Sequence, residues 1–175
     1  MTMNELVAKN RCYRRFHQDA RVSREALVEL VGLARLAATS GNSQPLKFLL
    51  SADPARNALI FPHLAWAAYL KDWPGPPEGE RPAAYILVLG DNELKQSFGC
   101  DHGIAAQTIL LGAVEKGLGG CMIANIRRPD LSRALALPDH LAILLAIALG
   151  RPKERVVIEH VGPDGDIRYW RDADG

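Results

Sequence analysis

The sequence has no large excess of either charge and few aromatic residues. Lys and Arg total 21 against 20 Asp and Glu, giving a formal net charge of +1. A chain so nearly neutral has no overall field to attract nucleic acid or an anionic membrane. Aromatic residues make up only 6% of the chain, which disfavours binding of single-stranded nucleic acid by base stacking. We therefore expect no nucleic-acid partner.

Long hydrophobic runs and export signals are also missing. The longest apolar run, Leu141 to Leu149, has about half of the roughly 18 residues that indicate a membrane span. Residues 1–10 lack the basic head and apolar stretch of a signal peptide. Three cysteines without C-x-x-C spacing cannot all pair within one chain, which favours a reducing compartment. We expect a cytoplasmic protein that does not bind membranes.

Sequence motifs for hydrolysis and metal binding are lacking as well. No G-x-S-x-G motif offers a serine nucleophile. The five histidines are scattered, and only Cys100 and His102 bring two metal-ligating residue types together, so we expect no metal site. A cysteine-dependent enzyme using Cys100 or Cys121 is one alternative, although such cysteines are more often small buried hydrophobic residues.

Helical and strand patterns are mixed along one domain, residues 1–175. With 48% apolar residues, a chain of this length can bury a large core without disulfides. The helical and strand segments do not alternate as regular βαβ units, which predicts an α+β fold. Helices are predicted from the N-cap Ser23 to 38, from 54, over 101–117 and over 129–137, and strands over 46–51, 85–89, 121–126 and 141–149, with a hairpin of 156–161 and 167–170.

Residues 73–82 form the one long irregular connection, with four prolines and two glycines. They predict a surface loop within the domain rather than a domain boundary. A loop of this length often covers a site, and Tyr69, Lys71 and Trp73 are candidate lid residues. A loop packed against the domain is the simpler interpretation.

Four cations, Lys9, Arg11, Arg14 and Arg15, lie within seven residues. Arginine binds phosphate oxygens through two parallel hydrogen bonds, so a cluster of this kind suits a phosphate group. A solvated turn between helices is the alternative explanation.

Residues 39–45 place five polar side chains around Gly41 directly after a predicted helix. Such a set of donors and acceptors suits polyol hydroxyls and a pyrimidine edge. A helix C-cap with Gly41 in the left-handed conformation would explain Gly41 and Asn42, but not Gln44.

Residues 117–120 contain three glycines and lie between a predicted helix and a predicted strand. A dinucleotide-binding loop has the reverse order, with the strand first, so these glycines are interpreted as a helix stop.

Four segments taken in order resemble the nitroreductase family: RCYRRF at 11–16, SGNSQP at 40–45, DHGIAAQ at 101–107 leading to GLGGC at 117–121, and LGRP at 149–152. The resemblance implies an α+β fold with a mainly antiparallel central sheet flanked by helices. It also implies an FMN-dependent homodimer whose two flavins lie at the subunit interface, each held by both chains.

Carried over by position, the resemblance assigns flavin contacts to ten residues. Arg11 and Cys12 match phosphate and ribityl contacts, and Arg14 matches the basic residue beside the pyrimidine edge. Polar residues of the 39–44 corner match contacts from the partner chain, and residues 123–124 match backbone that bonds the N5 and O4 side. The predicted cofactor-binding residues are Arg11, Cys12, Tyr13, Arg14, Thr39, Ser40, Asn42, Gln44, Ile123 and Ala124.

The implied activity passes reducing equivalents from NADH or NADPH to a small conjugated acceptor by a ping-pong mechanism, without a protein nucleophile. Nitroaromatics, quinones, enones and free flavin are candidate acceptors. An FMN-binding module for storage or sensing, without efficient turnover, is the alternative function.

The sequence departs from the family pattern at the expected phosphate site. Cys12 replaces the usual serine, and Asn10 replaces a frequent arginine. Many relatives also continue past the segment matching 169–172 into a basic tail, whereas this sequence stops at residue 175. Arg151, Lys153 or Arg155 could supply the missing cation, and the sequence does not choose among them.

Overall fold

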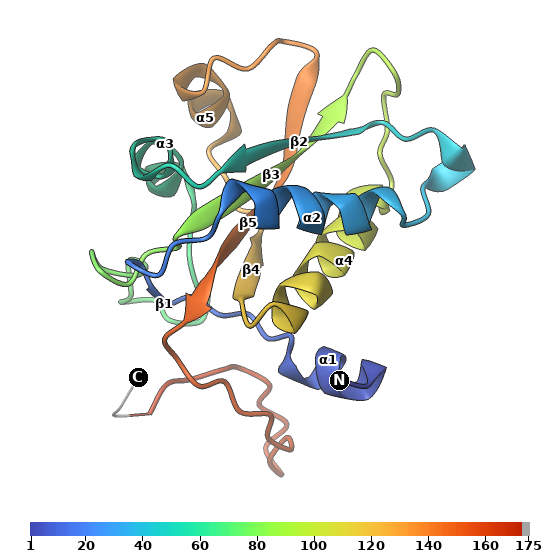
Figure 1. The fold of residues 1–175 in the computed structure, drawn as a ribbon. Helices are drawn as coiled ribbons and strands as arrows, with labels where there is room; N and C mark the ends of the chain where they lie inside the picture. The colour runs from blue at the N-terminus through green and yellow to red at the C-terminus, as the bar shows by residue number, and fades with distance from the viewer. Residues whose placement is uncertain (173–175) are drawn as a thin grey trace.

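The long strand β5 (Leu141–Pro152) organises the sheet in the computed structural model, which describes residues 1–172. It pairs with β3 (Ala84–Asp91) along one edge and with β4 (Gly119–Ile123) along the other. β2 (Leu46–Ser51) extends the sheet beyond β3, and the short β1 (Phe16–His17) pairs with the end of β5. All these pairings are antiparallel, which confirms the predicted α+β fold with a mainly antiparallel sheet (Figure 1).

Helices cover both faces of this sheet because the side chains of β3 alternate between them. Ile86 and Val88 pack with α2 (Arg24–Arg35) and α4 (Asp101–Glu115) in one cluster. Tyr85 and Leu87 face a second cluster, to which α3 (Pro54–Ile60) and α5 (Arg128–Ala134) contribute. The sheet is therefore the middle layer of the molecule (Figure 1).

A β-bulge in β5 places Ile143 and Leu145, which are two residues apart and would share a face in a regular strand, on opposite faces of the sheet. Val88 pairs with Leu145 and Leu89 with Ile143, which leaves Leu144 without a partner in β3. Arg128 binds the exposed carbonyls: its Nε donates to Ile143 O (2.8 Å) and its Nη2 to Leu144 O (3.1 Å). The same Nη2 donates to Ala124 O at 3.0 Å, which ties the bulge to the residue after β4.

Side-chain caps start the predicted helices where expected. Ser23 accepts a hydrogen bond from Ala26 N (3.1 Å), and Asp53 accepts from Arg56 N (3.2 Å). A further helix, α1 (Met3–Lys9), was not predicted from the sequence; it begins at a capping box formed by Thr2 and Glu5. Within the described part of the chain, none of the helices is long and apolar enough to cross a lipid bilayer.

Most predicted strands are present, but the predicted hairpin is wrong. Residues 156–161 and 167–170 are irregular and largely exposed, although Gly165 N donates to Gly162 O (3.0 Å) in the predicted turn. The β-branched residues of this segment favour a strand only where another strand is available to pair with it. Strand β4 starts and ends earlier than predicted, and α2 ends at residue 35 rather than 38. Residues 173–175 of the predicted domain lie outside the described residues.

The loop 73–82 packs against the domain. Gly75 has a φ of +117°, and a Cβ there would lie 2.6 Å from Cδ1 of Trp66. Both facts require glycine. Gly75, Pro76 and Pro82 are buried, so this connection is part of the folded core rather than a free flap.

Replacing Gly120 with alanine should destabilise the protein. A Cβ at this position would lie 2.5 Å from the backbone oxygen of Ala148 in the neighbouring strand. We expect Gly120→Ala to lower the free energy of unfolding by about 1–3 kcal/mol in urea denaturation. The matched control is Gly103→Ala in α4, where a Cβ meets nothing within 4 Å. Alanine there should stabilise the helix slightly, and equal losses in both variants would contradict the argument.

Candidate functional site

Segment 11–14 lies directly against the start of β4. Tyr13 N donates to Gly120 O at 3.0 Å, and Cys12 forms a parallel bridge with Gly120. A Cβ on Gly119 would collide with the ring of Tyr13. The three glycines of 117–120 therefore do more than stop a helix. Gly117, with a φ of +71°, ends α4 as predicted. Gly119 makes room for the Tyr13 ring, and Gly120 makes room for the backbone of β5 and for Leu110 of α4.

The cations of the basic cluster have different environments. Arg11 binds the last carbonyls of α1, through Nη2 to Val7 O (2.8 Å) and Nε to Asn10 O (2.7 Å). The Arg14 guanidinium donates to Cys12 O (3.3 Å) and lies 4.6 Å from the centre of the Tyr169 ring. The solvated turn is thus an incomplete description of this segment, because both arginines are held in place.

Arg15 belongs to an ion cluster instead. Its Nε lies 2.5 Å from Glu80 Oε2, and Lys153 Nζ lies 2.8 Å from Glu80 Oε1. Hydrogen bonds from these two cations lower the pKa of Glu80 to about 2. This cluster joins the loop 73–82 to β1 and to the end of β5.

The nearly buried carboxylate of Glu154 fixes the backbone of the same segment. It accepts hydrogen bonds from Arg14 N and from Arg15 N, the latter at 3.2 Å. Its other oxygen accepts from Arg171 Nη2 at 3.1 Å. Glu154 thus connects the N-terminal segment to the C-terminal segment that follows β5.

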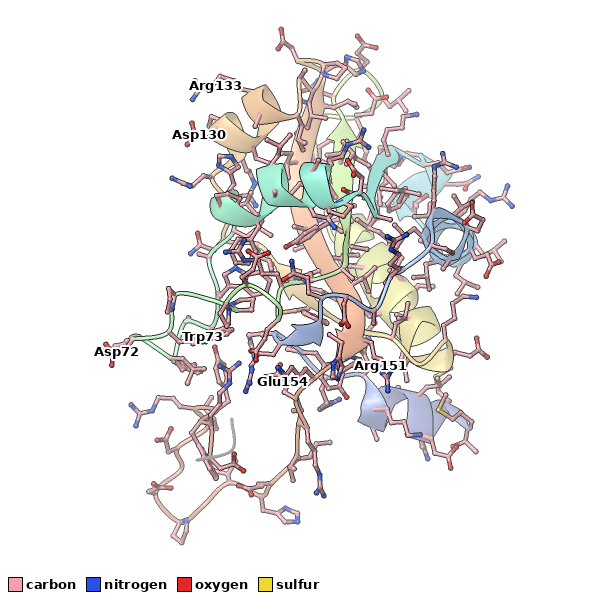
Figure 2. The ribbon with its side chains drawn as sticks, turned by 60° about the vertical axis from the view of Figure 1, so that its left-hand side comes forward. Asp72, Trp73, Asp130, Arg133, Arg151 and Glu154 are labelled. Carbon is pink, nitrogen blue, oxygen red and sulfur yellow. The ribbon has the colours of Figure 1, made fainter. Side chains whose placement is uncertain are left out.

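The C-terminal segment closes a cleft of about 680 Å³ over Cys12 and Arg14. Tyr169 packs on Tyr69 with ring centres 5.0 Å apart, and the Arg171 guanidinium lies 4.0 Å from the centre of the Trp73 ring. Figure 2 shows Trp73 and Glu154 at the end of the molecule where this segment returns. Two of the predicted lid residues, Tyr69 and Trp73, therefore contact the C-terminal segment, whereas Lys71 is exposed.

The structure distinguishes the three cations that the sequence could not rank. Lys153 is paired with Glu80, and Arg151 lies on β5 opposite His17. Arg155 lines the same cleft as Cys12 and Arg14. Its guanidinium has no hydrogen bond or ion pair within residues 1–172. Arg155 is thus the cation available to an anion in the cleft.

The polar corner of residues 39–44 is a separate turn, η1 (Ser40–Asn42), beyond the end of α2. Ser40 N donates to the buried Asp101 Oδ1 (2.9 Å), and Gln44 Nε2 donates to Asn42 Oδ1 (3.1 Å). The φ angles of Gly41, Asn42 and Gln44 are +61°, +52° and +47°. Gly41 is left-handed as expected, but it does not cap α2, which ends at Arg35 with Leu36 as its C-cap.

The two halves of the predicted site lie at opposite ends of α4. Asp101 at the start of this helix holds Ser40, while Gly120, just beyond its end, holds Cys12. A helix of 15 residues is roughly 22 Å long. The corner and the basic segment of one chain are therefore not brought together around a single small ligand.

Ile123 and Ala124 lie at the far end of β4 from Cys12. Ile123 is buried, whereas Ala124 is exposed and its carbonyl accepts from Arg128. At roughly 3.3 Å per residue, Ala124 is roughly 13 Å along the strand from Gly120. Segment 11–14 thus lies beside the start of β4, and residues 123–124 lie at its end.

The cysteine-dependent alternative gains little support. Cys121 is buried in the core, and its hydrogen bond to Cys12 together with burial raises its pKa. An enzyme of this kind needs a thiolate that a substrate from solution can reach, so the burial and raised pKa of Cys121 disfavour it as the nucleophile toward a substrate. Cys100 is exposed and caps α4 at the end distant from the cleft.

Asp91, Glu93 and His140 place three ligand atoms within 4.8 Å of one another, at the end of the sheet opposite the cleft. Asp91 is already engaged, since its carboxylate lies 3.7 Å from Lys47 Nζ and accepts from Glu93 N at 3.0 Å. Exposed acidic groups are common without an ion, and the absence of a metal site stays a prediction.

Comparisons with known proteins give one family and a consistent fold. The family model described as the nitroreductase family matches residues 7–151. A 5,6-dimethylbenzimidazole synthase of Rhodospirillum rubrum is 25% identical over 192 positions, covering 97% of this chain and 89% of that protein. A candidate NADH dehydrogenase/NAD(P)H nitroreductase of Archaeoglobus fulgidus is 24% identical, covering 80% of each protein. A candidate nitroreductase of Exiguobacterium sibiricum, solved in complex with FMN, superposes with a TM-score of 0.76 at 19% identity, covering 98% of both chains.

The Glu80 cluster predicts a pH-dependent contribution to stability. Because folding lowers the pKa of Glu80 from 4.5 to about 2, its contribution is complete above pH 4.5 and is lost as the pH falls toward 2. After allowance for solvent screening, we expect Glu80→Gln to cost about 1–2 kcal/mol at neutral pH. The difference from wild type should shrink at about pH 3 in urea denaturation. Glu78→Gln, at an exposed ion pair, is the control; a similar pH-dependent loss there would count against the cluster.

Proposed function

The chain belongs to the nitroreductase family, which its match over residues 7–151 establishes, and on that premise we propose that it is an FMN-dependent oxidoreductase using NADH or NADPH. This match confirms the family and the oxidoreductase type expected from the sequence. The proposed acceptor is a small conjugated molecule: a nitroaromatic, a quinone, an enone or a flavin. The observation that carries the proposal is the cleft that collects Cys12, Arg14 and Arg155.

The residues of the cleft fit FMN. Its volume of about 680 Å³ lies within the range of small-molecule sites. FMN offers a phosphate dianion, ribityl hydroxyls and a pyrimidine edge that becomes more negative on reduction. Arg155 is unpaired among the described residues, and Arg14 is held near Cys12 by hydrogen bonding. Five carboxylates also line the cleft, of which Glu154 and Asp166 are paired with Arg171 and Arg168. Arg14 and Arg155 are the cations there that suit an anionic ligand.

In this proposal the positions of the arginines define their roles. Arg155 would bind the phosphate in place of the cation missing at Asn10. Arg11, which binds carbonyls at the end of α1 and is not among the residues lining the cleft, would reach the phosphate only by releasing them. Arg14 would face the pyrimidine edge and stabilise negative charge there. Glu154 anchors the backbone of Arg14, and the Tyr169 ring holds its guanidinium. Because the side chain is already ordered, it loses little conformational entropy when the ligand binds.

When bound, FMN would supply the hydride-transfer chemistry between the nicotinamide and the acceptor. The chain's own residues bind and orient the reactants. Tyr69, Trp73 and Tyr169 provide aromatic surfaces beside Arg14 and Arg171, on which planar conjugated molecules can stack. Because nicotinamide and acceptor would use the same space in turn, a ping-pong order follows. No protein nucleophile is required.

We further propose a homodimer that completes each site. The corner residues Thr39, Ser40, Asn42 and Gln44 are separated from the basic segment by the length of α4, so they would contact the flavin of the partner chain. Two features support a second copy as partner. The C-terminal segment exposes large apolar side chains, with Trp170 at 66% and Ile158 at 63% exposure. Leu33 and Leu36 of the α2 region line an apolar groove of about 360 Å³.

An FMN-binding module without efficient turnover is the second candidate. Cys12 and Asn10 favour it, because they replace a hydroxyl and a cation at the proposed phosphate site. Both candidates require flavin binding, and they differ in whether a reduced nicotinamide delivers electrons to it.

The absorbance spectrum tests the function directly. We expect the purified protein to be yellow and to lose its flavin absorbance when NADH or NADPH is added without oxygen. A yellow protein that neither nucleotide bleaches would favour the binding module. A colourless protein that takes up no added FMN would contradict both functions.

Variants of the two cleft arginines test the site. Loss of a charge-assisted hydrogen bond costs about 1.5–3 kcal/mol, so Arg14→Ala and Arg155→Ala should each raise the FMN Kd about 10- to 100-fold. Arg14→Ala should also slow reduction of the bound flavin. Arg133→Ala, on α5 at the far end of the molecule (Figure 2), is the control. Unchanged FMN affinity in a cleft variant would remove that residue from the site.

A further inference from the structure

Two of the three free thiols meet where segment 11–14 crosses β4. Cys12 is paired through its backbone with Gly120, which places it beside Cys121. Each thiol is the largest influence on the pKa of the other, and Cys121 Sγ also donates to Met122 O at 3.5 Å. Cys121 is one residue further along β4 than the bridged Gly120. With strands roughly 4.8 Å apart and a rise of roughly 3.3 Å per residue, the Cα atoms of Cys12 and Cys121 are expected roughly 5.8 Å apart, within the roughly 4.4–6.8 Å that disulfides span. The backbone arrangement is therefore compatible with a bond between the two sulfur atoms.

The two cysteines differ in accessibility. Cys12 is exposed and lines the cleft, whereas Cys121 is only 4% exposed. An oxidant in solution can therefore reach the first sulfur but not the second. Cys100, the third thiol, is exposed at the opposite end of α4.

The surroundings of the two cysteines also shift their pKa values in opposite directions, down for the exposed Cys12 and up for the buried Cys121. The hydrogen bond from Cys121 and the charges of Arg14 and Arg11 outweigh burial and lower the pKa of Cys12 to about 6. The hydrogen bond to Cys12, burial and the negative charge of Glu154 raise the pKa of Cys121 despite the nearby Arg14. At neutral pH the exposed sulfur is thus a thiolate, and its buried neighbour keeps its proton.

We propose that Cys12 and Cys121 form a redox-active dithiol that closes to an intramolecular disulfide when a hydroperoxide oxidises Cys12. The Cys12 thiolate attacks the outer peroxide oxygen, the O–O bond breaks, and an alcohol or water leaves with a proton from solvent. Cys12 is then a sulfenic acid. The sulfur of Cys121 attacks the Cys12 sulfur, the S–O bond breaks, and the Cys121 proton leaves with the hydroxide as water. Two thiols are oxidised and one peroxide is reduced.

The proposal does not depend on the flavin, so its failure would leave the proposed function untouched. It gives a role to the thiol of Cys12, which lines the proposed FMN cleft but supplies no charge or hydroxyl there. Without a neighbouring thiol, a sulfenic acid at Cys12 could be oxidised further to the irreversible sulfinic and sulfonic acids, whereas a disulfide with Cys121 stops the oxidation at a stage that dithiothreitol reverses.

The test is to treat the reduced full-length protein with hydrogen peroxide and count its thiols under denaturing conditions with N-ethylmaleimide. The number of reactive thiols should fall from three to one. The intact mass should be lower by the two hydrogens lost, and peptide mapping should find Cys12 joined to Cys121. Dithiothreitol should restore all three thiols.

Variants separate this outcome from simple oxidation. In Cys121→Ala, Cys12 should gain oxygen instead of forming a bond, and the protein should become heavier. Cys100→Ser should behave as the wild type. Should Cys121→Ala fold poorly, Cys12→Ser gives the complementary result, because Cys121 should then keep its thiol. Wild-type protein that accumulates oxygen on Cys12, or that crosslinks only between chains, would overturn the proposal.

The pH dependence of alkylation gives a second readout. The rate of Cys12 alkylation by iodoacetamide should reach half its maximum near pH 6, because Cys121, Arg11 and Arg14 favour its thiolate. Removing the Arg14 charge in Arg14→Ala should shift this midpoint upward. A midpoint at the ordinary value for a free thiol, about 8.5, would contradict the assigned environment.

Discussion

The close approach of the Cys12–Tyr13 backbone to Gly119 and Gly120 is the constraint on which the candidate site depends. Any side chain at these glycines would strike Tyr13 or the carbonyl of Ala148. The missing side chain at Gly119 admits the Tyr13 ring, and the one at Gly120 admits β5. With both in place, Tyr13 N bonds to Gly120 O and Cys12 lies beside β4 next to Cys121. The same contact aims Arg14 into the cleft that the C-terminal segment closes.

Local chemistry made much of the fold predictable. Strand β2 has the bounds read from the sequence, and Ser23 and Asp53 start helices because each bonds an amide within its own first turn. The predicted hairpin failed for the opposite reason. Val157 and Ile158 favour a strand, but no neighbouring strand in the described structure pairs with them. Whether a strand has a partner depends on residues far away in the sequence, so the pattern of six residues in one segment cannot predict it.

The sequence showed which segments contribute to the candidate site. It did not show which of their charged side chains are paired within the protein and which are available to a ligand. The cations at 9–15 look equivalent in sequence, yet Arg15 is occupied by Glu80, which lies 65 residues later. Lys153 is occupied by the same carboxylate, and only the tertiary structure leaves Arg155 open to the cleft. Glu154 and Tyr169 had no motif to mark them, because their importance comes from the returning C-terminal segment.

The length of α4 also determines how damage would be shared between subunits in the proposed dimer. Each chain would lend its basic segment to one flavin and its hydroxyl-rich corner to the other, so the two contributions of a single chain never serve the same cofactor. Consider a dimer in which one subunit has a defective basic segment and its partner has a defective corner. One flavin site would then have both contributions intact, and the other site would have both contributions defective. In such a dimer, two inactive alleles would complement each other genetically because one helix separates the two contributions of each chain.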